Sequence, residues 1–383
     1  MRYLGRVCGV LLLTTGSVCV AQTVNVTTPV TQIQTVSPAA TVQPQTVPAT
    51  PQIATRGIFD SERWNSVIDN IRTQARAKGV SESMIKSALR YPAYIPSIVK
   101  SDKHQAEFKL TMEKYLSRMV NSERVKNGRK MRTKYPTLLS RVDKKFGVPP
   151  HVILAFWGLE SNYGQHKAHH KLTDAFLTLV YEGRRETFFT NQLIALMKFA
   201  DKNKLDVDDI RGSWAGAMGH FQFIPTTLAQ YGVDGNGDRR VDIIDSVGDA
   251  MFSAGNYLNK LGWNKNERIV RRVILPADFD ITLLDGKTKK TLPEWAVMGV
   301  TNPDGTPIPQ NNMMAGLVAD TAQIEAARAQ FIADSATQSL DADVAPQPAI
   351  VAYLTYPNFY RIKKWNNSNW YAIAIATLAD NLK

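Results

Sequence analysis

Cysteine is almost missing from this chain of 383 residues. The two that occur, Cys8 and Cys19, both lie within the first 21 residues. From residue 22 onward no thiol and no disulfide can form, so the fold depends on core packing and on any bound metal. With 44% hydrophobic and 21% charged residues, the chain can bury a sizeable core.

A long apolar run is missing at the N-terminus. The run at 7–13 is short, and it follows the basic residues Arg2 and Arg6. It is too short to span a bilayer, and its small-residue exit predicts a signal peptide over residues 1–21. We therefore expect an exported protein. A buried N-terminal helix and lipid attachment at Cys19 are the alternatives.

Charged and aromatic side chains are missing from residues 22–55, which are mostly Thr, Val, Pro, Gln and Ala. Such a segment cannot bury enough apolar surface to offset the entropy lost on ordering. We predict a disordered linker there, followed by one folded domain over residues 56–383.

Acidic residues are fewer than basic ones, 34 against 46, and the net charge is +12. This excess favours an anionic partner: nucleic acid, acidic lipid headgroups or a polyanionic wall polymer. Export argues against nucleic acid. The dense basic run at 124–134 is interpreted as a solvated helix face rather than a groove for a polyanion.

Strand signals are sparse, and the best are at 268–275 and 349–354. A helix is expected over 148–159, since a proline pair suits its start and Gly164 its end. Further helices are expected over residues 186–202, 225–231, 246–261 and 318–337, with a polar loop over 336–347. The predicted class is mainly α (α+β), with a small β element late in the chain.

One carboxylate ends an otherwise apolar helix, in the segment Ala-Phe-Trp-Gly-Leu-Glu-Ser-Asn-Tyr-Gly at 155–164. Phe156 and Trp157 lie four and three residues before Glu160, on the same helix face. A carboxyl group against aromatic rings loses hydration of its charged form, so its pKa rises, as a general acid requires. The alternative is a helix-end carboxylate that points into water.

A second segment, 212–225, is rich in glycine and alanine, which let backbone approach a ligand closely. Ser213 and Gln222 offer neutral hydrogen-bonding groups, as sugars need, and Trp214, Phe221 and Phe223 offer flat apolar faces. The alternative is tight helix packing through small residues, and the two interpretations are compatible.

These two segments resemble the lytic murein transglycosylase B family, and the resemblance extends from residue 59 to the end. Tyr115, the Arg184-Arg185 pair, Tyr257 before Gly262-Trp263, Tyr-Pro-Asn-Phe at 356–359 and Trp-Asn-Asn-Ser-Asn-Trp-Tyr-Ala at 365–372 match family motifs. The sequence departs from the family where Trp365 replaces a frequent tyrosine, at the variable His220-Phe221, and in the longer stretch 316–347.

The resemblance implies a lysozyme-like helical catalytic core over about 148–265. A helical segment up to about 147 would flank it, and the C-terminal part would close the cleft. It also implies a lyase that cuts the MurNAc–GlcNAc bond of peptidoglycan and leaves 1,6-anhydroMurNAc ends. Glu160 would be the sole acid and base. The nearest downstream acid, Asp174, is equally well explained as a capping or structural residue.

The resemblance further assigns glycan contacts to six residues: Tyr115, Ser213, Gln222, Tyr257, Asn366 and Tyr371. Arg184 and Arg185 would meet anionic lactyl or peptide carboxylates, where planar bidentate donors fit best. A surface ion pair is the alternative for both arginines.

Residues 234–245 are close to a twelve-residue EF-hand loop. The expected Ca²⁺ ligands are Asp234, Asn236, Asp238, the backbone carbonyl of Arg240, and Asp245. Arg239 replaces the turn glycine at position 6, and Asp245 replaces the longer glutamate at position 12. We therefore expect a weak or structural calcium site. A turn without metal is the alternative.

Two other functions stay open: a lysozyme-type muramidase that hydrolyses the same bond, and a non-catalytic wall-binding protein. The expected partner is the glycan strand, and no organic cofactor is expected. The predicted state is a monomer in the periplasm, with a lipid-anchored outer-membrane form as the alternative.

Overall fold

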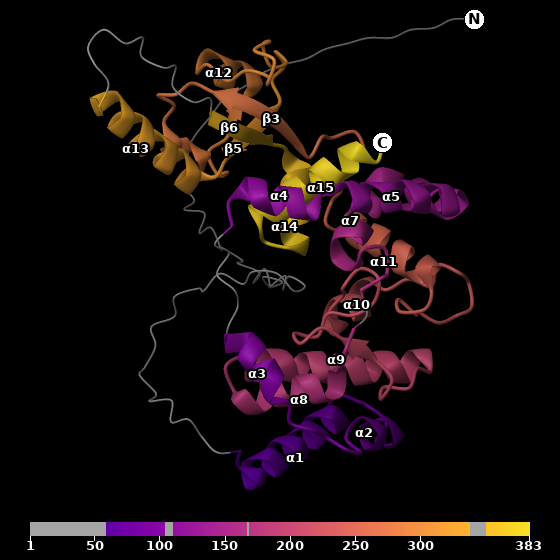
Figure 1. The fold of residues 1–383 in the computed structure, drawn as a ribbon. Helices are drawn as coiled ribbons and strands as arrows, with labels where there is room; N and C mark the ends of the chain where they lie inside the picture. Colours follow the sequence, from indigo (N-terminus) through magenta and orange to yellow (C-terminus); the bar gives the residue numbers. More distant parts are fainter. Residues whose placement is uncertain (1–58, 104–109, 167, 338–349) are drawn as a thin grey trace, which may run out of the picture. The chain divides into compact units, whose positions relative to one another are not determined.

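The computed structural model of the chain describes residues 59–103, 110–166, 168–337 and 350–383 (Figure 1). The predicted signal peptide over 1–21, the predicted linker over 22–55 and most of the predicted loop over 336–347 lie outside them. Helices dominate the described part and strands are few, so the predicted mainly α (α+β) class is confirmed. Within this part, no helix combines the length and the apolar character needed to cross a membrane.

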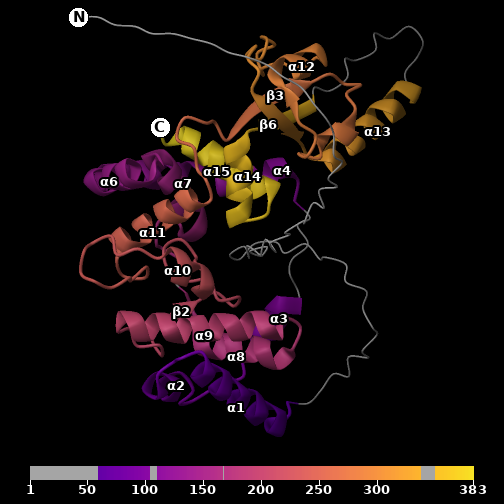
Figure 2. The same cartoon turned by 180° about the vertical axis from the view of Figure 1, so that it is seen from behind.

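Two long helices, α8 (Leu172–Glu182) and α9 (Glu186–Asn203), pack side by side (Figures 1 and 2). Three N-terminal helices pack against this pair: α1 (Ser61–Ala77), α2 (Glu82–Ala88) and α3 (Pro96–Lys103). Asp60 begins α1 by accepting hydrogen bonds from two backbone N–H groups of its first turn. The predicted helix over 186–202 is thereby confirmed as α9.

Three helices come next in the chain and precede a buried helix: α4 (Met112–Met119), α5 (Ser122–Lys134) and α6 (Pro136–Phe146). In the buried helix, α7 (Pro150–Ser161), every residue from 152 to 158 is buried, which explains its uniformly apolar sequence. The predicted helix over 148–159 is confirmed with a shift of two residues. Pro149 stays extended before the first turn, and Asn162 ends α7 with a left-handed φ of 48° before Gly164 is reached.

The short strand β1 (His170–Lys171) precedes α8 and pairs with β2 (Arg211–Gly212), which follows α9. Helices α10 (Pro225–Tyr231) and α11 (Val247–Lys260) come next. The predicted helices over 225–231 and 246–261 are confirmed. Helix α11 packs closely on α6: a Cβ added at Gly255 would lie 2.8 Å from side-chain atoms of Val142 and Phe146.

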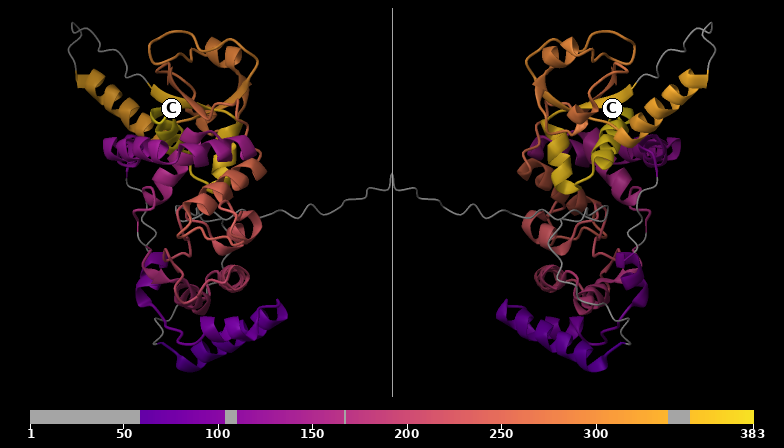
Figure 3. Two further views of the ribbon diagram at one scale, coloured as in Figure 1. Left: turned by 90° about the vertical axis from the view of Figure 1, so that its right-hand side faces the viewer. Right: turned by 90° about the vertical axis from the view of Figure 1, so that its left-hand side faces the viewer.

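The β element is a four-stranded antiparallel sheet of order β3-β6-β5-β4, shown in orange and yellow in Figure 3. Its strands are β3 (Val270–Leu275), β4 (Lys290–Thr291), β5 (Met314–Val318) and β6 (Ile350–Thr355). Both predicted strands are confirmed, as β3 and β6, and they pair with Val270 opposite Thr355. A 3₁₀ turn, η1 (Ile281–Leu284), and α12 (Leu292–Val297) complete a separate small core around Trp295.

After the sheet, α14 (Pro357–Trp365) and α15 (Asn369–Asn381) bring the chain back to α7, against which α15 packs. Helix α13 (Thr321–Thr337) confirms the helix predicted over 318–337. This return places the end of the sequence beside the carboxylate at the end of α7.

The basic run at 124–134 lies on α5, and two of its arginines form hydrogen bonds with backbone carbonyls at the end of α15. Arg132 Nη1 donates to the Leu382 carbonyl at 2.6 Å, and Arg129 Nη2 donates to the Asn381 carbonyl at 3.3 Å. Most of the other basic side chains of α5 are exposed. The run therefore acts as a solvated helix face that also holds the C-terminal helix.

Candidate active site

Glu160 stands in the last turn of α7 and is bound by two donors from the C-terminal helices. The Tyr371 hydroxyl donates to Glu160 Oε1 at 2.5 Å, and Trp365 Nε1 donates to the same oxygen at 3.0 Å. Tyr371 lies in the first turn of α15 and Trp365 at the end of α14. Three helices therefore meet at one carboxyl group.

Burial raises the pKa of Glu160 to about 7, because removing water costs the charged form more than the neutral form. The hydrogen bonds from Tyr371 and Trp365 act in the opposite direction and lower the pKa. The residue still keeps part of its surface accessible. A carboxyl group that is half protonated at neutral pH and reachable from outside can both give and take a proton.

The two oxygens of Glu160 differ in their surroundings. Oε1 accepts both hydrogen bonds, whereas no hydrogen bond reaches Oε2 from any residue that the structure describes. An oxygen that accepts two donors has little room for a proton of its own. The acidic proton of Glu160 is therefore best carried by Oε2.

No second carboxylate in the described residues contributes to the pKa of Glu160. Asp174, the nearest downstream acid, is buried in α8, where its Oδ1 accepts a hydrogen bond from the Ala93 N–H at 3.1 Å. It therefore has the structural role that the sequence left open. Glu160 as the sole acid and base stays a prediction.

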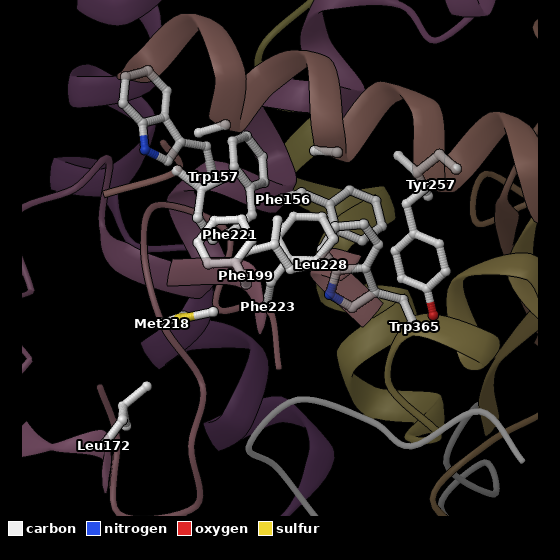
Figure 4. Close-up of a cluster of buried hydrophobic side chains, with 14 of the residues drawn as sticks. Phe156, Trp157, Leu172, Phe199, Met218, Phe221, Phe223, Leu228, Tyr257 and Trp365 are labelled. Carbon is white, nitrogen blue, oxygen red and sulfur yellow. The ribbon is translucent and has the colours of Figure 1, made fainter. Parts of the chain in front are cut away.

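Aromatic rings form the wall behind the carboxyl group, and Figure 4 shows several of them. The Trp365 ring lies 4.8 Å from Phe156, 5.3 Å from Phe223 and 4.9 Å from Tyr257, measured between centroids. The predicted apolar setting is thus present, but the ring that hydrogen-bonds to Glu160 is Trp365. Trp157 instead donates from Nε1 to His220 Nδ1 at 3.1 Å.

The expectation that Phe221 and Phe223 offer faces to sugar rings is wrong. Their exposed fractions are 0% and 1%, so both belong to the core (Figure 4). The glycines of this segment also face protein: a Cβ added at Gly216 would lie 2.2 Å from the Phe176 ring. Tight packing explains these small residues, and Trp214 is the partly exposed ring of the segment.

The structure brings three of the predicted glycan-binding tyrosines close to Glu160. Tyr371 binds it directly, and Tyr257 packs on Trp365. Burial raises the pKa of Tyr115 to about 12, and the charge of Glu160 adds to this rise. Tyr115 also packs on Trp370, with centroids 5.6 Å apart.

The other predicted glycan-binding residues are polar, and some of their polar atoms already form hydrogen bonds within the protein. Ser213 Oγ accepts from the Ala217 N–H at 3.0 Å, and Gln222 Nε2 donates to the Gly219 carbonyl at 2.9 Å. Gln222 has a left-handed φ of 50°, an uncommon backbone conformation outside glycine. Asn366 is buried, and its Oδ1 has no hydrogen-bond partner among the described residues.

Arg184 and Arg185 both bind Asp102, a carboxylate that is only 7% exposed. Arg184 Nε lies 2.8 Å from Asp102 Oδ2, and Arg185 Nη2 lies 3.3 Å from Oδ1. The ion pair that the sequence left as an alternative is therefore present. The Arg184 side chain still keeps 55% of its surface exposed, so an anion could reach it.

The predicted calcium loop brings together a different set of acids from the one expected. Carboxylate oxygens of Asp234, Asp238 and Asp249 lie within 4.8 Å of one another. Asp249 is fully buried, whereas Asp245 is exposed and is not among the converging groups. The expected ligand at position 12 is thus replaced by a residue from the first turn of α11.

Backbone N–H groups orient these carboxylates. Asp249 Oδ1 accepts from Gly235 at 2.9 Å, and Asp234 Oδ2 accepts from Arg239 at 2.7 Å. The Gly237 N–H holds the pKa of Asp234 below its ordinary value. Arg239, where an EF-hand has glycine, takes a φ of 68°. Converging carboxylate oxygens are ligands of the kind that Ca²⁺ prefers.

Residues 63–380 match the model of the transglycosylase SLT domain. The chain belongs to that family. A curated relative of this SLT domain is the membrane-bound lytic murein transglycosylase B of Escherichia coli (strain K12), 29% identical over 270 residues. That match covers 68% of this chain and 64% of the relative, so the chain spans less than two thirds of that protein.

Solved structures of related proteins share the fold of this SLT domain. SltB3 from Pseudomonas aeruginosa, solved with NAG-anhNAM-pentapeptide, is 34% identical to this chain and has a TM-score of 0.73. The match covers 83% of this chain and 79% of the SltB3 chain. The Escherichia coli lytic transglycosylase Slt35, solved with calcium, is 25% identical to this chain and has a TM-score of 0.66. The match covers 84% of this chain and 92% of the Slt35 chain. The predicted family resemblance and lysozyme-like fold are confirmed.

Two residues of the SLT domain site escaped the sequence analysis. Trp365 was noted only as a departure from a frequent tyrosine, although its indole binds Glu160. Its position six residues before Tyr371, within one motif, was the available signal. Asp249 was missed because the EF-hand spacing pointed to Asp245, four residues earlier.

Proposed function

We propose that this chain is a lytic transglycosylase that cuts the MurNAc–GlcNAc bond of peptidoglycan without water. It would leave 1,6-anhydroMurNAc ends, with Glu160 as the sole acid and base. The observation that carries the proposal is the pKa of Glu160, raised to about 7 by burial, with no second carboxylate of the described residues acting on it. A hydrolase normally needs a second carboxylate, to activate water or to form a covalent intermediate.

In the first step, Glu160 Oε2 gives its proton to the oxygen that bridges MurNAc and GlcNAc. The bond from MurNAc C1 to that oxygen breaks, and GlcNAc leaves with the proton. Positive charge develops at C1. Since no second carboxylate of the described residues acts on Glu160, the substrate's own N-acetyl group is proposed to stabilise that charge.

In the second step, the ionised Glu160 takes the proton of the MurNAc C6 hydroxyl while the C6 oxygen attacks C1. The new bond closes the anhydro ring, and the proton returns to Glu160. Tyr371 and Trp365 hold Oε1 throughout and support the charged form between the two steps.

The remaining predicted residues would hold the strand. Tyr115, Ser213, Gln222, Tyr257, Asn366 and Tyr371 are proposed to contact the glycan. Arg184, which stays partly exposed beside Asp102, is the better placed of the two arginines to meet a lactyl or peptide carboxylate.

Calcium is proposed as a structural ion of the loop at 234–249. Asp234, Asp238 and Asp249 would supply carboxylates, with Asn236 and the Arg240 carbonyl as further oxygens. The ion would neutralise the converging negative charges and stabilise the loop. No step of the proposed reaction involves it.

We further propose that the chain works in the periplasm as a monomer, with glycan strands as its partner. The predicted signal peptide and the relationship to an Escherichia coli lytic transglycosylase support this location. The name of that relative, a membrane-bound enzyme, also supports the alternative of a lipid-anchored form.

Mass spectrometry of purified peptidoglycan after digestion tests the proposal. We expect products lighter by one water than hydrolytic fragments, and no reducing MurNAc ends. Reducing ends would instead indicate the muramidase. The Glu160→Gln variant should bind strands and form no product, and an active variant would contradict the assigned role. If the wild-type chain binds strands and never cuts them, it is the non-catalytic wall-binding protein.

A further inference from the structure

A cavity of about 440 Å³ borders α14, and Glu160 is not among the residues that line it. Its lining joins apolar side chains with cations, among them Leu261, Met314, Pro357, Lys289, Arg361 and Lys364. We call it the cationic pocket. Of these residues, only Pro357 was noted in the sequence, as part of the motif at 356–359.

Lys289 is held in place at this pocket by polar groups from the sheet and from α14. Its Nζ donates to the Gly286 carbonyl at 3.1 Å, contacts the Tyr360 hydroxyl, and lies 3.5 Å from the centre of the Tyr360 ring. Thr355 Oγ1 lies 2.6 Å from the same hydroxyl. An ammonium group has three donors, so Lys289 has one donor left for a ligand.

The positive charges around the pocket are only partly compensated, by Asp285 near Lys289 and by Glu267 at Arg361. Among the described residues, none of Lys287, Lys289, Lys363 and Lys364 forms an ion pair, whereas Arg361 is neutralised by Glu267 at 2.5 Å. Burial lowers the pKa of Lys289 to about 8; the charge of Asp285 opposes this change, and the smaller effect of Lys363 adds to it. Burial also lowers the pKa of Lys363, with Lys287 adding to the effect. An anion bound among these groups would relieve their repulsion.

The pocket is joined to the catalytic site through α14. Lys364 directly precedes Trp365, whose indole binds Glu160, and the Tyr257 hydroxyl donates to the Lys364 carbonyl at 3.4 Å. The end of α14 therefore borders both the catalytic carboxyl group and the pocket, and a glycan strand bound at Glu160 would carry its substituents near this helix. In peptidoglycan those substituents are peptides that carry several carboxylates and methyl groups.

We propose that the cationic pocket binds carboxylates of the peptide stems, so that the enzyme recognises stems as well as sugars. This inference rests on the proposed function. The exposed Met314, with 48% of its surface accessible, and Pro357 give the apolar contacts that alanine methyl groups need. A membrane surface also carries anions, but a flat array of headgroups does not fill a concave pocket.

The test compares two substrates and two double variants. Lys289→Gln with Lys364→Gln removes two charges from the pocket, and Lys86→Gln with Lys202→Gln removes two exposed charges elsewhere. On stem-bearing strands we expect the pocket variant to raise KM about three- to tenfold with kcat unchanged. On strands stripped of stems by an amidase, it should match the wild type. The control variant should match the wild type on both.

Equal loss on stripped and intact strands would overturn the inference, as would no loss on either. If the pocket variant instead loses binding to phosphatidylglycerol vesicles while its KM on intact strands is unchanged, the pocket binds membranes. That result would also overturn the inference. Equilibrium binding in a Glu160→Gln background repeats the comparison without turnover. Stem recognition is therefore tested even if the wild type forms no anhydro product, a result that would contradict only the proposed function.

Discussion

In the proposed reaction, Glu160 has to be protonated when the glycosidic bond breaks and ionised immediately afterwards. A pKa of about 7 makes both forms accessible at neutral pH. Burial and hydrogen bonding act against each other here, since the first favours the neutral acid and the second favours the carboxylate. The balance between them would set the pH range of the proposed reaction.

Removing the Tyr371 hydroxyl tests this balance. Because the hydroxyl stabilises the charged carboxylate, Tyr371→Phe should raise the pKa of Glu160 further. The free enzyme loses its acid as pH rises through this pKa. The alkaline limb of kcat/KM should therefore move up by about one pH unit, while the maximum falls. Tyr91→Phe, at a side chain that is 74% exposed, is the control. A limb that stays in place or moves down would contradict the assignment.

The same carboxyl group should cost stability above its pKa. Its folded pKa lies above the ordinary value of 4.5, so the folded state binds more protons and loses stability as pH rises from about 4.5 through about 7. A glutamine at 160 can still accept from Tyr371 and Trp365 and carries no charge. Thermal unfolding should show Glu160→Gln more stable than wild type by on the order of 2 kcal/mol at pH 8.

At pH 4 that difference should vanish, because Glu160 is then neutral in the folded protein. Glu325→Gln, at an exposed residue of α13, should show no such pH dependence. A Glu160→Gln variant that is equally stable at both pH values would show that burial does not penalise the charge.

Among the secondary-structure elements, α15 matters most to the site, because it presents Tyr371 from its first turn. Ser368 begins the helix, and its Oγ accepts from the Tyr371 N–H at 3.3 Å. Ser368→Ala should cost about 1 kcal/mol of stability and should also lower kcat, since the Tyr371 hydroxyl loses its fixed position. Unfolding curves and turnover rates measure the two effects.

Ser81 provides a matched comparison, since its Oγ caps α2 by accepting from the Met84 N–H, also at 3.3 Å. Ser81→Ala should lose similar stability and keep kcat. Ser368→Asp should restore both properties at α15. If the two alanine variants lose kcat equally, the fall reflects stability alone.

The elements themselves were largely predictable from the sequence. Prolines marked the start of α7 and α10, and β-branched runs marked β3 and β6, because these are local effects of backbone restriction and side-chain shape. The sequence predicted that Glu160 would lie among aromatic rings, but it did not predict which residues donate hydrogen bonds to it. Trp365 lies 205 residues and Tyr371 211 residues beyond Glu160, and no local pattern places them there.

The sequence also did not predict which side chains are buried. Phe221 and Phe223 have the composition of a sugar-binding surface, yet the same apolar faces pack equally well into a core. In the calcium loop, spacing alone favoured Asp245 over Asp249. Only the position of α11 beside the loop makes the buried carboxylate the converging one.

For the molecule as a whole, calcium should contribute to stability through the loop before α11. If the ion binds the folded chain alone, a 100-fold excess over its Kd should add roughly 2.7 kcal/mol. Calorimetry with and without a chelator should show a higher Tm with Ca²⁺ for the wild type, and a loss of that shift in Asp249→Asn. Asp245→Asn should keep the shift. The reverse pattern would restore the ligand set expected from the EF-hand spacing.

The return of α15 to α7 also has a consequence for the timing of activity. Trp365 and Tyr371 are made 205 and 211 residues after Glu160, so a chain that stops before α14 lacks both donors to Oε1. Under the proposed function, such a fragment has no complete active site, and the acid can work only once both C-terminal helices have been made and have packed on α7.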